Sequence, residues 1–196
     1  QPKPPDKNGK ELPSNQPVTL RISSSIASIL TSHKQCVFAC AFSPNSSLLA
    51  TGSEDGTAII WSMKDGVPVD SKTVGYLVDE ANTNNSNDQN LVASDVGITS
   101  VDFDSTGRYF ATGSFDSFIR LYDNQGNYIT KMGVPNHNIF TIKFSPSGKY
   151  LVSGSDDKSP IVWNIPSGTI HYAFMNHTES ILGVSWRDDN IFATAS

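Results

Sequence analysis

The sequence of 196 residues predicts an all-β fold made of repeated units of four short strands. The first observation behind this prediction is a segment that occurs three times, as "LLATGSEDGTAIIW" at 48–61, "YFATGSFDSFIRLY" at 109–122 and "YLVSGSDDKSPIVW" at 150–163. A fourth copy begins as "IFATAS" at 191–196. In each full copy two apolar runs flank a Gly-Ser-x-Asp segment, so we expect a strand, a tight turn at Gly-Ser-x-Asp and a second strand.

The second observation is an apolar piece before each copy, and the third is a turn signal after its last aromatic residue. The upstream pieces are "VFACAFSP" at 37–44, "ITSVDFDS" at 98–105, "IFTIKFSP" at 139–146 and "ILGVSWRD" at 181–188. The turn signals are "KDG" at 64–66, "NQG" at 124–126 and "PSG" at 166–168. Each unit therefore begins with an innermost strand and ends with an outer strand behind a hairpin turn.

Four short strands in a unit of roughly 40 residues are typical of one blade of a β-propeller. We expect three four-stranded blades at about 33–69, 97–131 and 136–175, the start of a fourth at 176–196, and an acidic insertion at 70–96. We expect the whole propeller to need seven or eight blades, at the upper end of the usual range of about 4–8, so this sequence holds less than half of them. We therefore expect residues 18–196 to be the N-terminal part of a larger propeller that supplies the remaining blades, with a helix content near zero.

Three segments fall outside the blade pattern. Residues 1–17 are rich in proline and polar residues, which predicts a flexible linker. The run "SIASIL" at 25–30 predicts a lone N-terminal strand that closes the ring by completing the last blade. In the insertion, the Asn-rich acidic run at 79–90 predicts a solvated loop, whereas "KTVGYLV" at 72–78 predicts an outer strand.

Composition excludes several classes of function. The net charge is −5, which disfavours direct binding of nucleic acid because phosphate contacts need a basic surface. No apolar run approaches the ~18 residues that span a membrane, and no secretory signal is visible, so we expect neither membrane contact nor secretion. Cys36 and Cys40 would lie about 13 Å apart on one strand at ~3.3 Å per residue, too far for a disulfide, which indicates reduced thiols.

One set of polar residues in the first unit has a recognisable arrangement. His33 can donate a hydrogen bond to Asp55, with the Thr51 hydroxyl as a link and the Trp61 indole as a further donor. A catalytic triad is the alternative for His, Asp and a hydroxyl. The set degenerates in later units, where Ser94 or Pro135 stands for His33 and Tyr122 for Trp61, and His177 recurs in unit four. An active site would not be repeated and lost in this way, so a structural role is predicted, with no catalytic residue, cofactor or metal ligand.

These four residue types at this spacing resemble the buried polar tetrad of WD-repeat β-propellers, and the resemblance covers residues 32–196. The terminal Trp-Asp dipeptide of that family is altered here. It reads Trp61-Ser62, Tyr122-Asp123 and Trp163-Asn164 in the three units.

The resemblance implies a partner-binding face at the mouth of the central channel. Residues one step from the inward-pointing Val37, Ile98, Ile139 and Ile181 should face the channel, and the residue before each turn Asp should lie at its rim. The partner-binding residues we expect on this face are Phe38, Glu54, Thr99, Phe115, Phe140, Asp156 and Leu182. Ordinary blade packing is the alternative for the three phenylalanines, least so for Phe115, whose turn position offers little to pack against.

One level closer, the chain resembles the transducin-β-like corepressor family from about Leu12 to Ser196. The resemblance lies in "VFACAFSPNSSLLATGSEDGTAIIW", in the long insertion that follows it and in "GITSVDFDSTGRYFATGSFDSFIRLYDNQGNYITKM". It continues in "NIFTIKFSPSGKYLVSGSDDKSPIVWN" and "FMNHTESILGVSWRDDNIFATAS". Pro160 at a strand start and the sequence of the Asn-rich loop depart from the family pattern.

This resemblance implies a non-enzymatic nuclear scaffold, a propeller subunit of a histone-deacetylase corepressor complex that binds corepressor segments and histone tails. The alternatives are a cytoplasmic adaptor, such as a substrate receptor of a ubiquitin ligase, and a scaffold in ribosome assembly or splicing. The fold does not separate these classes.

Overall fold

A computed structural model describes residues 28–75, 93–134 and 136–196. The chain divides into a unit of residues 1–30 and a unit of residues 31–196. In the first unit only residues 28–30 are described, and they form no regular secondary structure. The expected linker at 1–17, the first half of the expected closing strand at 25–30 and the Asn-rich run at 79–90 lie outside the described residues and stay predictions. The second half of that closing strand, residues 28–30, does not form a strand.

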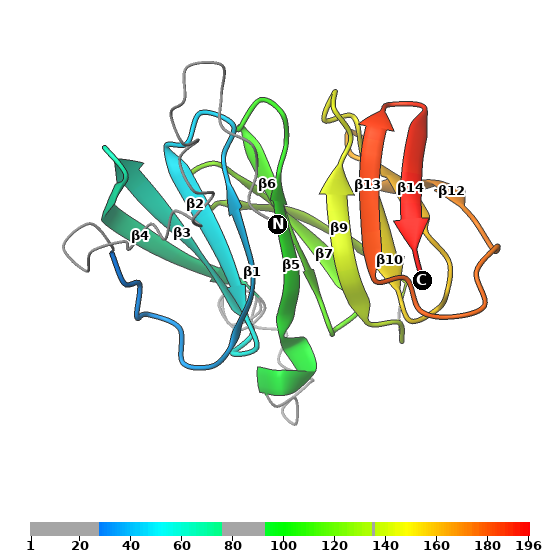
Figure 1. Cartoon of the computed structure of the whole chain (residues 1–196), viewed down its shortest axis with the longest axis horizontal. Coiled ribbons are helices and arrows are strands. Elements are labelled where there is room, and N and C mark those ends of the chain that lie inside the picture. The colour runs from blue at the N-terminus through cyan, green and yellow to red at the C-terminus, as the bar shows by residue number, and fades with distance from the viewer. Residues whose placement is uncertain (1–27, 76–92, 135) are drawn as a thin grey trace, which may run out of the picture. The chain divides into compact units, whose positions relative to one another are not determined.

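The described residues of the second unit form three four-stranded antiparallel sheets and one two-stranded sheet (Figure 1). Blade one has β1 (Val37–Phe42), β2 (Leu48–Ser53), β3 (Thr57–Lys64) and β4 (Val67–Gly75). Blade two has β5 (Ile98–Phe103), β6 (Tyr109–Ser114), β7 (Phe118–Asp123) and β8 (Tyr128–Gly133). Blade three has β9 (Ile139–Phe144), β10 (Tyr150–Ser155), β11 (Ile161–Asn164) and β12 (Thr169–Ala173). Blade four is represented by β13 (Gly183–Asp188) and β14 (Ile191–Ala195).

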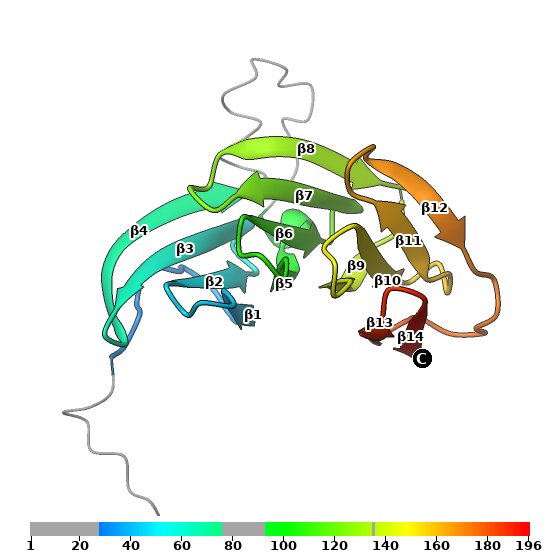
Figure 2. The ribbon, with the colours of Figure 1, turned by 90° about the horizontal axis from the view of Figure 1, so that it is seen from above.

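The strands of each blade follow one another in chain order, from an inner to an outer strand. Figure 2 shows the inner strands β1, β5, β9 and β13 along the concave side of the second unit and the outer strands β4, β8 and β12 along its convex side. The only helical segment among the described residues is a single 3-10 turn, η3 (Ala93–Val96). No helix in this part of the chain is long and apolar enough to span a membrane. The expected all-β partial propeller is confirmed.

Burial follows the position of each strand within its blade. The second strands β2, β6 and β10 are buried at every residue but the first, whereas the outer strand β12 is exposed throughout. Hairpin turns lead into the outer strands, and Gly66, Gly126 and Gly168 hold φ values of 76°, 73° and 66° there. A left-handed backbone of this kind favours glycine, which explains the three turn signals.

A repeated contact joins each blade to the next. The side chain of Ile98 at the start of β5 packs on Gly52 in β2, and Ile139 packs on Gly113 in the same way. Ile98, Ile139 and Ile181 are buried as expected. Val37, the matching residue of blade one, is 52% exposed, so its expected burial stays a prediction. The described residues hold no preceding blade against which Val37 could pack.

Two boundaries differ from the expected ones. Gly52 and Ser53 end the strand β2 instead of forming the turn, so the tight turn consists of the residues that follow, and the Gly-Ser-x-Asp segment is only partly a turn. The outer strand β4 runs on to Gly75 because it pairs with β3 along its whole length. The outer strand expected at 72–78 is therefore present over 72–75, and it belongs to blade one and not to the insertion at 70–96.

Candidate protein-interaction face

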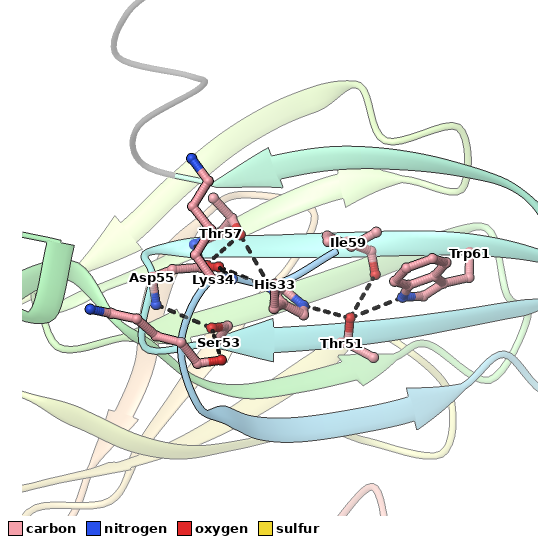
Figure 3. A network of polar contacts seen from close by, with 9 residues as sticks. His33, Lys34, Thr51, Ser53, Asp55, Thr57, Ile59 and Trp61 are labelled. Atoms are coloured by element: carbon pink, nitrogen blue, oxygen red, sulfur yellow. Dashed lines mark hydrogen bonds and ion pairs between the residues drawn. The ribbon is translucent and has the colours of Figure 1, made fainter. Parts of the chain in front are cut away.

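The four tetrad residues of blade one meet in one hydrogen-bonded network (Figure 3). His33 Nε2 lies 2.8 Å from Thr51 Oγ1, and His33 Nδ1 lies 3.3 Å from Asp55 Oδ2. The indole N–H of Trp61 donates to Thr51 Oγ1 over 3.0 Å, and the Thr51 hydroxyl donates to the carbonyl of Ile59 over 3.4 Å. The network ties the loop before β1 to the second and third strands.

Asp55 is the most heavily bonded member of this network. It accepts hydrogen bonds from the backbone N–H of Lys34 at 2.8 Å, from the backbone N–H of Thr57 at 3.0 Å and from the Thr57 hydroxyl at 2.5 Å. Burial acts to raise the pKa of Asp55, but the hydrogen bonds from Thr57 and Lys34, together with the nearby His33, bring it below its ordinary value of 3.8. The carboxylate is thus held in its charged form by the fold.

This network fits a structural role better than a catalytic one. Thr51 and Asp55 are buried, and the Thr51 hydroxyl already has contacts to three groups. A nucleophile needs an open approach and a base that is free to accept its proton. Within the described residues, no group of three His, Cys, Asp or Glu side chains could hold a metal ion.

Blade two has a buried ion pair where blade one has the hydrogen-bonded network. This pair was not predicted from the sequence. Arg120 Nη2 lies 2.6 Å from Asp116 Oδ2, with side-chain exposures of 1% and 8%. Arg120 occupies the strand position held by Ile59 in blade one and Ile161 in blade three. The sequence did contain an indication of this pair. A cation within a buried strand requires an anionic partner, and the repeat residue Asp116 lies four residues before Arg120.

Blades three and four keep parts of the tetrad. In blade three the Trp163 indole donates to Ser153 Oγ over 2.9 Å. His137 Nδ1 lies 3.5 Å from Asp156 Oδ1 and does not contact the repeat residue Asp157. In blade four His177 Nε2 lies 2.7 Å from Thr194 Oγ1, which reproduces the contact between His33 and Thr51.

Three phenylalanines from successive blades form an aromatic face, which we define as Phe38, Phe115 and Phe140. The ring centroids of Phe38 and Phe115 are 6.3 Å apart at 68°, and those of Phe115 and Phe140 are 6.2 Å apart at 83°. Phe38 is 48% exposed, and the other two side chains are half-buried. Edge-to-face pairs of this kind stabilise by about 0.5–1.5 kcal/mol each. Phe115 therefore packs better than its turn position suggested, because it bridges rings from both neighbouring blades.

The same backbone contact builds the rim in each of the three blades. In each blade the backbone amide of the residue before the turn Asp donates to the carbonyl of the residue that precedes the inner strand. Glu54 donates to Cys36 over 2.9 Å, Phe115 to Gly97 over 3.0 Å and Asp156 to Asn138 over 3.2 Å. This hydrogen bond holds the rim residue beside the inner strand. The two carboxylates therefore lie at positions equivalent to that of Phe115.

The remaining predicted face residues differ in what they can offer a partner. The Glu54 carboxylate makes no hydrogen bond or ion pair within the part of the chain that the structure describes. Asp156 Oδ1 lies 3.5 Å from His137 Nδ1, so its carboxylate already has a neighbour within the chain. The Thr99 hydroxyl donates to the carbonyls of Gly113 and Ile139 at 3.0 and 2.6 Å, which makes it a bridge between blades. Leu182 is 68% exposed.

Comparison with known proteins agrees with the repeats and the network. The family model described as "WD domain, G-beta repeat" matches residues 24–62, 85–123 and 128–164. The chain belongs to the WD-repeat family. WD-repeat proteins are generally non-catalytic scaffolds that mediate protein–protein interactions, and this chain is a WD-repeat scaffold.

The relatives of this WD-repeat chain include long proteins. It is 33% identical over 179 residues to the F-box-like/WD repeat-containing protein TBL1X of Homo sapiens, covering 90% of this chain and 30% of that protein. It is 33% identical over 181 residues to the WD40 repeat-containing protein HOS15 of Arabidopsis thaliana, covering 91% and 29%. The resemblance to the transducin-β-like family is confirmed at this level. The chain spans about three tenths of the length of these relatives.

Solved structures show the same fold at lower identity. The WD40 repeats of RRP9 match with a TM-score of 0.70 over 85% of this chain and 46% of that chain. U3-55K matches with a TM-score of 0.69 over 85% and 47%. Both are 17% identical in sequence, so they establish the partial propeller and carry no information on function.

Proposed function

We propose that this WD-repeat chain is the interaction module of a nuclear transcriptional corepressor subunit that works with a histone deacetylase. Corepressor segments and histone tails bind across the aromatic face. The observation that carries the proposal is the contact of Phe38 and Phe140 with the ring of Phe115 between them, because it joins three blades into one continuous apolar surface that solvent still reaches.

The chemistry of this surface favours a peptide with an apolar or cationic anchor. Aromatic residues are enriched among the residues that dominate binding energy in protein interfaces, and they act best when neighbouring residues keep water out. The carboxylate of Glu54 lies at the rim without a partner among the described residues, so it can pair with a Lys or Arg of the bound segment. Lysine-rich histone tails and basic corepressor segments have this composition.

The role in transcription rests on similarity. The chain resembles TBL1X and HOS15 at 33% identity, and it is 27% identical over 157 residues to a protein named transcription initiation factor TFIID subunit 5 in Caenorhabditis elegans. That match covers 80% of this chain and 21% of that protein. A nuclear location follows from the proposed role.

Affinity purification of the full-length protein from nuclear extract tests the proposed function. The expected result is co-purification of a histone deacetylase with its corepressor subunits. Recovery of a cullin with its adaptor, or of pre-ribosomal proteins, in place of a deacetylase would contradict the proposal and support one of the alternative assemblies.

A further inference from the structure

A groove lies at the opposite end of blades two and three from the aromatic face. It has a volume of about 440 Å³ and lies between the turn that joins β5 to β6 and the turn that joins β9 to β10. These turns lie at the top of Figure 1, whereas η3 and the start of β5 lie at the bottom. Its size falls in the range of about 300–1,000 Å³ that is usual for pockets that bind ligands.

The floor of this groove is apolar and its rim is cationic. Leu121, Ile129 and Ile165 supply apolar side chains to the lining, and Ile129 is 46% exposed. Arg108 and Lys149 occupy equivalent turn positions in the two blades, and both side chains are exposed. The two cations therefore flank one apolar strip.

The two cations are held in place while their charges stay available. The guanidinium of Arg108 lies 5.6 Å from the ring centre of Tyr109, and the ammonium of Lys149 lies 5.1 Å from that of Tyr150. Arg108 Nε donates to the hydroxyl of Thr106 over 3.1 Å. Neither cation lies within salt-bridge distance of a carboxylate in the described part of the chain. The contact with tyrosine limits the motion of each cationic side chain, so a partner loses less side-chain conformational entropy when it binds.

Two carboxylates near the groove are already engaged. Asp104 is buried and accepts hydrogen bonds from the backbone of Tyr109 at 2.9 Å and from the backbone and hydroxyl of Thr106. Asp189 of blade four accepts a hydrogen bond from the Ser147 amide at 3.0 Å, and its pKa is lowered by the contacts with Ser147 and by the charge of Lys149. Asp189 thus offsets part of the charge of Lys149. Asp104 lines the groove with Arg108, but its carboxylate is bonded to Thr106 and Tyr109 and makes no ion pair with Arg108 within the described residues.

We propose that this groove binds an acidic peptide segment of a protein partner, with one apolar side chain on the strip of Leu121, Ile129 and Ile165 and flanking carboxylates on Arg108 and Lys149. Charge complementarity argues for this occupant, since a bound carboxylate adds charge-assisted hydrogen bonds at a rim where no carboxylate pairs with these cations. The groove is separate from the aromatic face, so the chain can hold two partner segments at once.

A binding measurement on the full-length protein tests the groove. The probe is a fluorescein-labelled synthetic peptide with a central leucine pair flanked by glutamates, and the comparison peptide carries lysines in place of the glutamates. We expect saturable binding of the acidic peptide, weakened by added salt because exposed charges are screened. We expect binding at least about tenfold weaker with Arg108→Glu combined with Lys149→Glu, and with Ile129→Asp.

Two variants separate this proposal from the proposed function. Lys64→Glu reverses an exposed charge outside the groove, and Phe115→Ala alters only the aromatic face, so both should bind the acidic peptide as the wild type does. Arg108, Lys149 and Ile129 are exposed, and unchanged thermal unfolding of their variants will show that the fold is intact. No saturable binding of the acidic peptide, equal affinity for the basic peptide, or unchanged affinity after the charge reversals would overturn the proposal.

Discussion

The Cγ2 methyl of Ile98 occupies the space that a β-carbon at Gly52 would need, since an ideal β-carbon there would lie 2.5 Å from it. The relationship recurs between Ile139 and Gly113, where the corresponding distance is 2.8 Å. The repeat glycine is therefore a requirement of packing between blades, because none of these φ values is positive. Each glycine admits the first side chain of the next inner strand and so fixes the spacing of the blades.

Gly52→Ala should lower the free energy of unfolding by about 1–3 kcal/mol, because the new methyl overpacks the contact with Ile98. Ile98→Leu removes the clashing branch while it keeps the volume, so the double variant should recover part of the loss in a double-mutant cycle of thermal or urea unfolding. Gly183→Ala is the matched control, since its nearest neighbour would lie at 3.6 Å. A Gly52→Ala protein as stable as the control would contradict the packing argument.

Removing members of the blade-one network should destabilise the protein without a specific effect on binding. Asp55→Ala leaves donors on His33, Lys34 and Thr57 unpaired and should cost about 1–3 kcal/mol. Trp61→Ala should cost about 3–5 kcal/mol, because it also empties a buried site. Both values can be measured by chemical denaturation of the intact protein. Loss of partner binding at an unchanged melting temperature would show that these residues have a functional role.

The buried pair of blade two predicts a marked non-additivity. Arg120→Ile leaves the Asp116 carboxylate buried without its cation and should cost about 3–5 kcal/mol. The combination of Arg120→Ile with Asp116→Asn removes both charges and should recover most of the loss, because isoleucine already occupies this position in blades one and three. Unfolding curves of the two single variants and the double variant give the coupling energy. If the changes in unfolding free energy of the two single variants add up to that of the double variant, Arg120 and Asp116 are not energetically coupled.

Two aspartates should give the stability opposite dependences on pH. The folded-state pKa of Asp55 is lowered below 3.8, so its stabilising contribution is present above about that pH and is lost as the pH falls through the folded pKa. Burial raises the pKa of Asp102 above 3.8 in spite of its 2.5 Å contact with Lys143, so the folded state gains stability as the pH falls through that raised pKa.

The stability of the wild type relative to Asp55→Asn should therefore decrease in acid, and its stability relative to Asp102→Asn should increase. Urea unfolding between neutral pH and about pH 3 measures both differences. The same sign of slope for the two variants would contradict the assigned environments.

Most of the fold could be predicted from the sequence, because the repeated segments show the order of strands and turns within each unit. The order of strands, the buried Ile98 and the meeting of His33 with Thr51 and Asp55 all follow from spacing within one unit. The exposure of Val37 did not follow, because its burial depends on a neighbouring blade and not on its own unit.

Only those features of the site that follow from a residue's position within the repeat could be predicted. The three phenylalanines were placed on one face, but the edge contacts of Phe115 depend on ring orientations across blades, which strand periodicity does not determine. The ion pair of Arg120 was not predicted, because the repeat pattern has isoleucine at this strand position in blades one and three. The hydrogen bond from Thr99 to the carbonyl of Ile139 also joins strands of different blades that are distant in sequence.

Quantitative capture of partners by the full-length Phe115→Ala protein tests the central claim most directly, with Tyr128→Ala as a control that removes an aromatic ring from the outer strand of the same blade. Phe115→Ala should lower stability by about 1–2 kcal/mol through its two lost ring contacts. It should also weaken capture of corepressor partners by about tenfold, as expected for an aromatic anchor. Tyr128→Ala should capture them as the wild type does. Wild-type capture by a folded Phe115→Ala protein would contradict the assignment of the aromatic face as the partner-binding site.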